Sequence, residues 1–304
     1  MNYQEILHRI YHETKHFANH GKVASYIPAL ANVPPELYGI SIACLDKKCF
    51  SVGDHAVPFS IQSISKVFTF TLAYSILGDK IWERIDREPS GNAFNSLVQL
   101  EHENGIPRNP FINAGAIVVA DILLSHFDDP AKVLLDFVRE QADDNNIFYD
   151  AEVARSEKET GHRNYALAHF MKSFGNIHNP VENVLDLYFH QCSMVMTTDQ
   201  LACSMLFLAN HGTNPHNGNK VLNISQSKRL KALLLTSGMY NESGDFAFRV
   251  GMSGKSGVGG GIVAVIPQLL SMAVWSPPLN ERGNSVAGFE AMELFTTYTG
   301  KSVF

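Results

Sequence analysis

The chain has 304 residues, of which 45% are hydrophobic and 18% are charged. This mixture supports a sizeable packed core and excludes a disordered or collagen-like chain. The 24 Lys and Arg residues against 30 Asp and Glu residues give a formal net charge of −6. Because no basic stripe runs along the sequence, we expect no nucleic-acid partner. The length fits one large domain or two modest ones, at about 100–200 residues per domain.

Cysteine usage and the apolar segments indicate the compartment. The four cysteines are too few for a disulfide scaffold, and none forms the C-x-x-C pair of a zinc ribbon or thioredoxin motif; they are Cys44, Cys49, Cys192 and Cys203. The N-terminal residues contain no apolar signal core. The longest apolar stretch, residues 258–275, is interrupted by Gly, Pro and Gln, so it is expected to form two buried strands rather than a membrane span. We therefore expect a cytoplasmic globular protein with reduced cysteines and no membrane partner.

Residues 3–18 are predicted to form an amphipathic helix, because apolar side chains recur there at helical spacing. Histidines follow every four residues on its other face, and stacked imidazoles at this spacing could hold a metal; they are His8, His12, His16 and His20. No carboxylate or cysteine cluster completes such a site. A solvated helix face is the favoured interpretation, and no metal is expected.

Two short strands, 37–45 and 49–52, are predicted to form a β-hairpin, across which Cys44 and Cys49 could face each other. Residues 61–77 are apolar nearly all round, and a helix of this kind belongs in the middle of a fold, where it is covered on every side.

The remaining segments divide the chain into two expected domains. Residues 79–221 predict helices separated by loops rich in Asn, Gly and Pro. Strand patterns return after them, at 246–252, 260–266 and 269–275, and a final helix is expected at 286–299. The strands thus come from opposite ends of the sequence. We expect an α/β sheet domain built from residues 1–78 and 222–304, with residues 79–221 inserted as an all-helical domain.

Ser63 and Lys66 form an S-x-x-K motif, and at i, i+3 on a helix the two side chains share a face. A partly desolvated lysine amine loses its proton more easily and can then take one from the serine hydroxyl. A second copy, Ser225 and Lys228, shows that the motif alone is weak. Its polar surroundings favour an ordinary helix N-cap for Ser225. Lys66 instead lies in the apolar helix, where a buried cation needs a functional reason.

Lys255, Ser256 and Gly257 form a K-[ST]-G motif, which together with an upstream S-x-x-K is typical of penicillin-recognising serine enzymes. The strand that carries it is expected beside the nucleophile, where its backbone N–H groups could stabilise an oxyanion. The glycines that follow, 259–261, fit the close approach of another backbone or of a substrate. A phosphate-binding loop does not fit, because Arg249 stands where its first glycine is required.

Several segments resemble, in the right order and over nearly the whole chain, the serine-dependent bacterial glutaminases. The segments are FSIQSISKV (59–67), NPFINAGAI (109–117), SEKETGHRN (156–164) and GKSGVGGGI (254–262), together with YIPALA (26–31), PSGNAFNS (89–96) and SGMY (237–240). The resemblance implies an α+β fold of the β-lactamase/transpeptidase type, with an antiparallel sheet flanked by helices plus an inserted all-helical domain. It also implies hydrolysis of L-glutamine to L-glutamate and ammonia without a metal or organic cofactor, and a homo-oligomer, either a dimer or a tetramer.

The same resemblance assigns roles to residues of this chain. Ser63 is implied as the nucleophile, Lys66 as its activating base and Tyr240 as a partner in proton transfer. The residues implied around glutamine are Tyr26, Ser63, Asn113, Glu157, Asn164, Tyr188, Tyr240 and Val258, the last through its backbone. A buried carboxylate at Glu157 could pair with the α-ammonium of free glutamine.

Taken without the resemblance, the sequence context of these residues favours ordinary structural roles. The charged segment around Glu157 predicts a solvated loop, Asn113 a helix N-cap, Tyr188 a core or rim aromatic, and Tyr240 a turn residue.

The implied reaction begins with attack of Ser63 on the side-chain carbonyl, while the backbone N–H groups of Ser63 and Val258 hold the oxyanion. A γ-glutamyl ester then remains on Ser63 until water releases glutamate. Two alternatives use the same scaffold. A β-lactamase or penicillin-binding-type hydrolase is disfavoured because the chain has no S-D-N triplet. A non-catalytic amino-acid sensor is disfavoured by the intact serine, lysine and K-S-G set.

Overall fold

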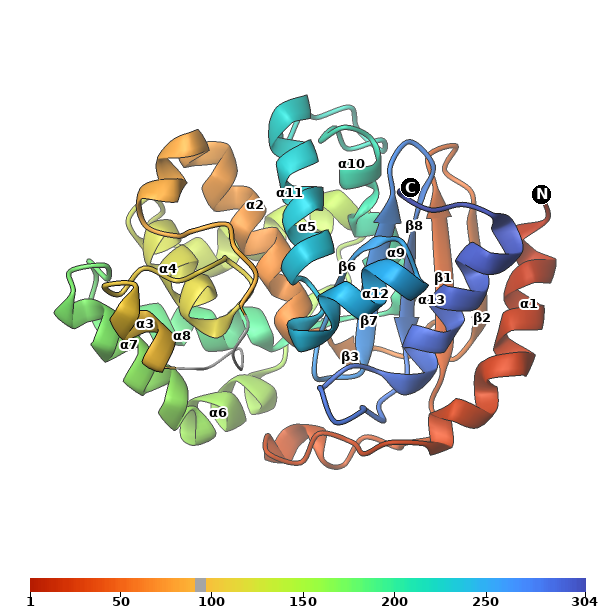
Figure 1. The fold of residues 1–304 in the computed structure, drawn as a ribbon, viewed down its shortest axis with the longest axis horizontal. Helices are drawn as coiled ribbons and strands as arrows, with labels where there is room; N and C mark the ends of the chain where they lie inside the picture. The colour runs from red at the N-terminus through yellow and green to blue at the C-terminus, as the bar shows by residue number, and fades with distance from the viewer. Residues whose placement is uncertain (91–96) are drawn as a thin grey trace.

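The computed structural model describes residues 1–90 and 97–304; most of the PSGNAFNS segment, residues 91–96, therefore lies outside the described residues. The described residues form an α+β fold with a five-stranded antiparallel sheet in the order β2-β1-β8-β7-β6. The strands are β1 (Gly39–Cys44), β2 (Cys49–Gly53), β6 (Ser253–Ser256), β7 (Gly261–Ile266) and β8 (Leu270–Trp275). Both ends of the chain therefore build one sheet, joined where β1 pairs with β8 (Figure 1).

Helices cover both faces of this sheet. Helices α1 (Tyr3–Thr14) and α13 (Val286–Thr299) pack on one face, and α9 (Thr198–Ser204) and α10 (Leu206–Ala209) pack on the other. Successive side chains of β7 point to opposite faces of the sheet, and both faces are apolar, which explains why helices cover both. Ile262 joins the apolar cluster under α1 and α13, whereas its neighbour Val263 joins the cluster on the α9 side.

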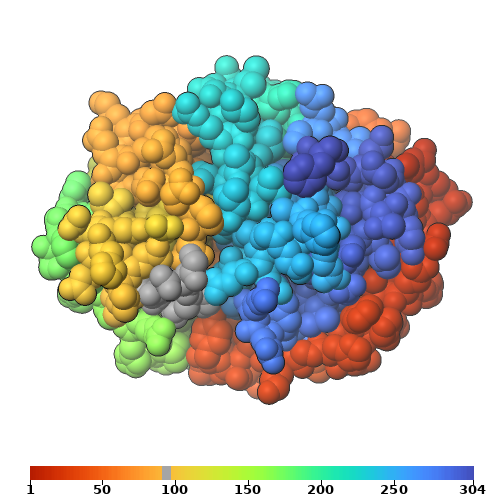
Figure 2. Space-filling model, viewed as in Figure 1, coloured from red at the N-terminus to blue at the C-terminus, as the bar shows by residue number. Residues whose placement is uncertain are grey.

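The second half of the molecule is helical. Its centre is α4 (Asn113–Leu124), which is buried at every position except Leu124 and packs against α2 (Ser65–Leu77), α7 (His162–Ser173) and α8 (Val181–Cys192). The other helices there are α3 (Val98–His102), α5 (Pro130–Ala142) and α6 (Ala151–Thr160). In the space-filling view this half, orange to green, adjoins a half in which the red and dark blue chain ends lie side by side (Figure 2).

A small three-stranded sheet, in the order β3-β5-β4, connects the two halves. Its strands are β3 (Phe59–Ser60), β4 (Phe148–Tyr149) and β5 (Met194–Met196). A 3-10 turn, η3 (Gln62–Ile64), follows β3 and leads directly into α2. The expected domain boundaries, 1–78 with 222–304 and 79–221, stay a prediction.

The strand predicted at 246–252 is wrong, because this segment forms most of helix α12 (Ser243–Arg249), and the edge strand begins only at Ser253. The strand prediction rested on the richness of this segment in Phe and Val. In the helix, Phe246 and Val250 are buried together, whereas Phe248 is 90% exposed. Arg249 secures the helix by binding two carboxylates of α13, Glu290 and Glu293.

Two smaller expectations also differ. The N-terminal helix ends at Thr14 and continues as a 3-10 turn over Lys15–Asn19. Cys49 pairs with Ala43 rather than facing Cys44, so the two cysteines point to opposite faces of the hairpin. The described residues contain no group of three or more His, Cys, Asp or Glu side chains that could hold a metal. Among the same residues, no helix is long and apolar enough to cross a membrane.

Candidate active site

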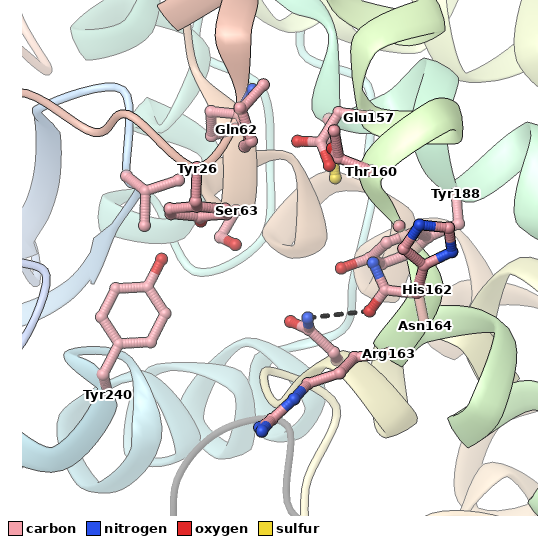
Figure 3. Close-up of a pocket in the computed structure, with 15 residues that line it drawn as sticks. Tyr26, Gln62, Ser63, Glu157, Thr160, His162, Arg163, Asn164, Tyr188 and Tyr240 are labelled. Carbon is pink, nitrogen blue, oxygen red and sulfur yellow. Dashed lines mark hydrogen bonds between the residues drawn. The ribbon is translucent and has the colours of Figure 1, made fainter. Parts of the chain in front are cut away.

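A cavity of about 220 Å³ lies between the glycine-rich end of β6 and helices α6, α7 and α8 (Figure 3). All eight residues that the resemblance implied around glutamine line this cavity: Tyr26, Ser63, Asn113, Glu157, Asn164, Tyr188, Tyr240 and Val258. The structure therefore brings together residues that are spread over more than two thirds of the sequence. Lys66 lies behind the cavity wall, one turn of α2 beyond Ser63.

Ser63 is held on a turn whose backbone is fixed from both sides. Gln62, directly before it, has φ +51°, a left-handed conformation that is uncommon outside glycine. The Gln62 amide donates a hydrogen bond to Ser60 Oγ at 3.0 Å, and the Ile61 N–H donates to Met194 O at 2.9 Å. Ser63 is left 9% exposed, at the surface of the cavity.

Lys66 is completely buried, and its Nζ donates hydrogen bonds to Asn113 Oδ1 at 2.7 Å and to Phe111 O at 3.2 Å. Burial lowers the pKa of Lys66 to about 8, although the nearby Cys192 and Glu157 raise it. A pKa of about 8 leaves roughly a tenth of this amine neutral at pH 7, against less than a thousandth for an ordinary lysine, so the neutral form that a base for Ser63 requires is accessible.

Asn113 is the first residue of α4 rather than its N-cap, which is Ile112. Both the oxygen and the nitrogen of its side-chain amide form hydrogen bonds. Oδ1 accepts from Lys66, and Nδ2 donates to Asn164 Oδ1 at 3.0 Å (Figure 3). This chain of contacts orients Lys66 and joins α2, α4 and α7 at the cavity.

Tyr240 begins the 3-10 turn η5 (Tyr240–Glu242) with φ +51°. Burial raises the pKa of its hydroxyl, whereas side-chain hydrogen bonds with Ser63 and Ser256 lower it. Lys255, also buried, lies with its Nζ 4.4 Å from the centre of the Tyr240 ring and donates to Ser256 O at 2.6 Å. Burial holds the pKa of Lys255 well below its ordinary value, and the Lys66 charge lowers it further. Tyr240 therefore keeps its proton, and it lines the cavity together with the candidate nucleophile.

The glycine-rich turn after β6 lies directly against the backbone that carries Ser63. The Gly257 N–H donates to Gly261 O at 2.9 Å. A Cβ on Gly257 would lie 2.4 Å from Ile61 O, and one on Gly259 would lie 2.2 Å from Ser60 O. The expectation that glycines permit close backbone approach is confirmed, and Val258 between them lines the cavity together with Ser63.

Glu157 is not in a loop but on α6, where it is 7% exposed. Burial raises the pKa of Glu157 to about 7, while the charge of Lys66 and a side-chain hydrogen bond with Gln62 act against this rise. Figure 3 shows Glu157 and Tyr240 on opposite sides of the cavity. The cavity therefore has a buried carboxyl group at one side and Tyr240 at the other, with Ser63 in its lining and Lys66 behind its wall.

Sequence reasoning missed several residues of the cavity wall: Ile27, Gln62, Thr160, Gly161, His162, Arg163 and Cys192. Most of them lie within the segments quoted for the resemblance, so proximity in sequence could have indicated them. Cys192 follows Tyr188 by four residues on α8, and helical spacing places the two on one face.

The second S-x-x-K copy is outside the site. Ser225 and Lys228 are both exposed on helix α11 (Ile224–Ser237). The expected N-cap role of Ser225 is wrong, because Asn223 caps this helix and its side chain accepts from the Gln226 N–H. The two copies thus differ in burial and in surroundings.

A buried serine and lysine pair beside a glycine-rich strand, in a sheet flanked by helices, defines a serine hydrolase of the β-lactamase-like fold. The family model described as glutaminase matches residues 21–304. A glutaminase from Aliarcobacter butzleri (strain RM4018) is 55% identical over 305 residues, covering 100% of both chains. A glutaminase from Sinorhizobium fredii (strain NBRC 101917 / NGR234) is 56% identical over 303 residues, covering 99% of this chain and 96% of its own.

Among solved structures, a probable glutaminase, ybaS, superposes with a TM-score of 0.94 at 36% identity and covers 99% of this chain and 97% of its own. A probable glutaminase from Bacillus subtilis, complexed with 6-diazo-5-oxo-L-norleucine, has a TM-score of 0.90 at 34% identity and covers 100% and 98%. The chain belongs to the glutaminase family, and its reaction is the hydrolysis of L-glutamine to L-glutamate and ammonia. The fold and activity implied by the resemblance are confirmed, and the comparisons give no support to a β-lactamase or a sensor.

Proposed function

We propose that the 220 Å³ cavity is the glutaminase active site, with Ser63 as the nucleophile and with Lys66 and Tyr240 moving the protons. The observation that carries this proposal is the contrast between the two S-x-x-K copies. Ser63 lines a polar cavity in front of a buried lysine, whereas Ser225 lies on an exposed helix face.

The proposed reaction follows from the placement of these groups. Ser63 Oγ forms a bond to the side-chain carbonyl carbon of glutamine while its proton passes to the Lys66 and Tyr240 pair. The carbonyl oxygen takes up negative charge beside the backbone N–H groups of Ser63 and Val258. The C–N bond then breaks, ammonia leaves with the returned proton, and a γ-glutamyl ester remains on Ser63. A water molecule hydrolyses this ester and releases glutamate.

The proposed binding mode uses both charged groups of the free amino acid. Glu157 pairs with the α-ammonium of glutamine. The side-chain amides of Asn113 and Asn164 and the hydroxyls of Tyr26 and Tyr188 form hydrogen bonds with its α-carboxylate. The cavity volume of about 220 Å³ is below the ~300–1,000 Å³ of sites for drug-sized ligands, which suits a single amino acid.

The serine copies supply a matched pair of variants. Ser63→Ala is expected to abolish ammonia release from glutamine, and Ser225→Ala is expected to leave it unchanged, with circular dichroism showing that both variants are folded. As a second probe, 6-diazo-5-oxo-L-norleucine should label the wild-type enzyme and Ser225→Ala but not Ser63→Ala. Equal loss of activity in the two variants would contradict the assignment.

A homo-oligomer, a dimer or a tetramer, is proposed on the family resemblance, and light scattering of the purified protein tests it. The cytoplasmic location expected from the sequence stays a prediction.

A further inference from the structure

Two segments that are far apart in sequence run antiparallel beside each other from the edge of the main sheet to the candidate nucleophile. Residues 49–61 include β2 and β3, and residues 194–203 include β5 and most of α9. From the outer to the inner end, the contacts join Cys49 to Cys203, Ser51 to Asp199, His55 to Thr198, Phe59 to Met196 and Ile61 to Met194. Ser63 follows the inner end by two residues, so this pairing supports the turn that carries it.

The outer end of this pair of segments is a pair of thiols. Cys49 Sγ and Cys203 Sγ are 3.7 Å apart, on residues 154 positions apart in the sequence. Cys49 is exposed and Cys203 is partly buried. Cys49 points toward α9 because its neighbours in the hairpin alternate between faces, and Cys44 points the other way, into the cluster under α1 and α13.

The two thiols are chemically unequal. The hydrogen bond between them lowers the pKa of Cys49 below its ordinary value, and the same bond raises the pKa of Cys203. Burial raises the pKa of Cys44 to about 11. Since the thiolate is the attacking species in disulfide exchange, the exposed Cys49 is the favoured first site of reaction. Cys203 is in position to attack the mixed disulfide that would form on Cys49.

We propose that Cys49 and Cys203 form a thiol–disulfide site that a low-molecular-weight disulfide oxidises, and that the resulting bond ties residues 49–61 to residues 194–203. The Cys49 thiolate attacks the small disulfide, forms a mixed disulfide and releases one small thiol. The Cys203 sulfur then attacks Cys49 Sγ and expels the second small thiol. The two protein thiols lose two electrons, and the small disulfide is reduced to two thiols. An S–S bond is about 2.05 Å long, so the sulfurs need to approach by roughly 1.7 Å.

The proposed consequence is stabilisation rather than inhibition. A bond between residues 154 positions apart restricts the unfolded chain strongly. Neither cysteine lines the catalytic cavity. Oxidation is therefore expected to raise the folding equilibrium constant by at least about tenfold and to leave kcat unchanged.

The experiment treats the native full-length protein with oxidised glutathione. Thiols are counted after denaturation, disulfides are mapped by peptide mass spectrometry, and urea unfolding and glutaminase activity are measured before and after. Wild type should lose two of its four thiols, yield a Cys49–Cys203 peptide and unfold at higher urea, all reversed by dithiothreitol. Cys203→Ser should stop at a mixed disulfide on Cys49, and Cys49→Ser should keep its three thiols.

Cys44→Ala is the matched control and should behave like wild type in thiol loss and cross-linking. The site is overturned if all four thiols survive, if the cross-link joins Cys44 to Cys49, or if it joins two chains. A Cys49–Cys203 bond that leaves the urea midpoint unchanged would overturn the stabilising role.

Discussion

Replacing Glu157 by Gln keeps the shape of the side chain but removes the negative charge proposed to pair with the substrate α-ammonium. The group is buried on α6, so the charge of a bound ammonium has little water to screen it. Removing one partner of a buried ion pair costs about 3–5 kcal/mol. At about 1.4 kcal/mol per factor of ten, kcat/KM for glutamine should fall by a factor between about 10² and about 4 × 10³ in Glu157→Gln.

The pH dependence of kcat/KM gives a second expected quantity, the slope of its fall in acid. Burial raises the pKa of Glu157 to about 7, and only the ionised form attracts the ammonium, so protonation below pH 7 weakens binding. The pKa of Lys66, lowered by its burial to about 8, adds a second group that must lose a proton before the enzyme is active. Because the two charges interact, both values belong to the pair. Log kcat/KM should therefore fall with a slope approaching two below pH 7 in wild type.

The assay is the pH profile of kcat/KM for L-glutamine and for N-acetylglutamine, which lacks the ammonium. Wild type should reject the acetylated substrate. Glu157→Gln should reduce the difference in kcat/KM between the two substrates. It should also reduce the slope of log kcat/KM below pH 7 to one, because only Lys66 still titrates. Glu159→Gln, an exposed position on the same helix, is the matched control and should resemble wild type. The reasoning is refuted if wild type hydrolyses N-acetylglutamine as well as glutamine, or if Glu157→Gln keeps the two-proton slope.

Three further substitutions test other parts of the structure. Lys66→Arg should lower kcat by at least about 10²-fold, because guanidinium stays protonated and cannot act as a base. Steady-state kinetics that give a near-normal kcat would show that Lys66 only positions its neighbours or neutralises their charge. Gly259→Ala should lower activity and thermal stability together, since the new Cβ would meet Ser60 O at 2.2 Å, and a thermal melt identical to wild type would contradict this. Asp121→Asn should lower the free energy of unfolding in urea by about 3–5 kcal/mol, because its buried carboxylate accepts from Arg84 and from backbone N–H groups; a change below 1 kcal/mol would count against a structural ion pair.

The buried serine and lysine pair could be predicted from the sequence because its signals are local. Ser63 and Lys66 are three residues apart, and the apolar run around them indicates a buried helix, which the structure contains as η3 and α2. The polar stretch around Ser225 in the same way indicates a surface helix. Hydrophobic periodicity carries this information without knowledge of the rest of the fold.

Glu157 could be found only through the resemblance. Its neighbours Arg155, Lys158 and Glu159 are exposed, so the composition of the segment is that of a solvated surface. One face of α6 turns inward against α8, and a single buried carboxylate on that face leaves no compositional signal. Burial of this kind is set by tertiary packing, which sequence context does not contain.

Non-local pairing limited the sequence interpretation in two other places. The alternating apolar residues around Phe246 fit a strand as well as one face of a short helix, and the contacts of Arg249 with α13, which favour the helix, come from residues about 40 positions away. The hairpin suggested Cys44 as the neighbour of Cys49, whereas the nearest thiol belongs to Cys203 on α9. In both cases the deciding contact lies far along the chain.

The covalent intermediate tests the central claim most directly. Wild-type enzyme mixed with L-glutamine, quenched in acid within the first turnovers and digested, is predicted to carry a γ-glutamyl group on the peptide that contains Ser63. Ser225→Ala should carry the same group, and Ser63→Ala should carry none and release no ammonia. A γ-glutamyl group on any other residue, or hydrolysis of glutamine by Ser63→Ala at the wild-type rate, would contradict the account.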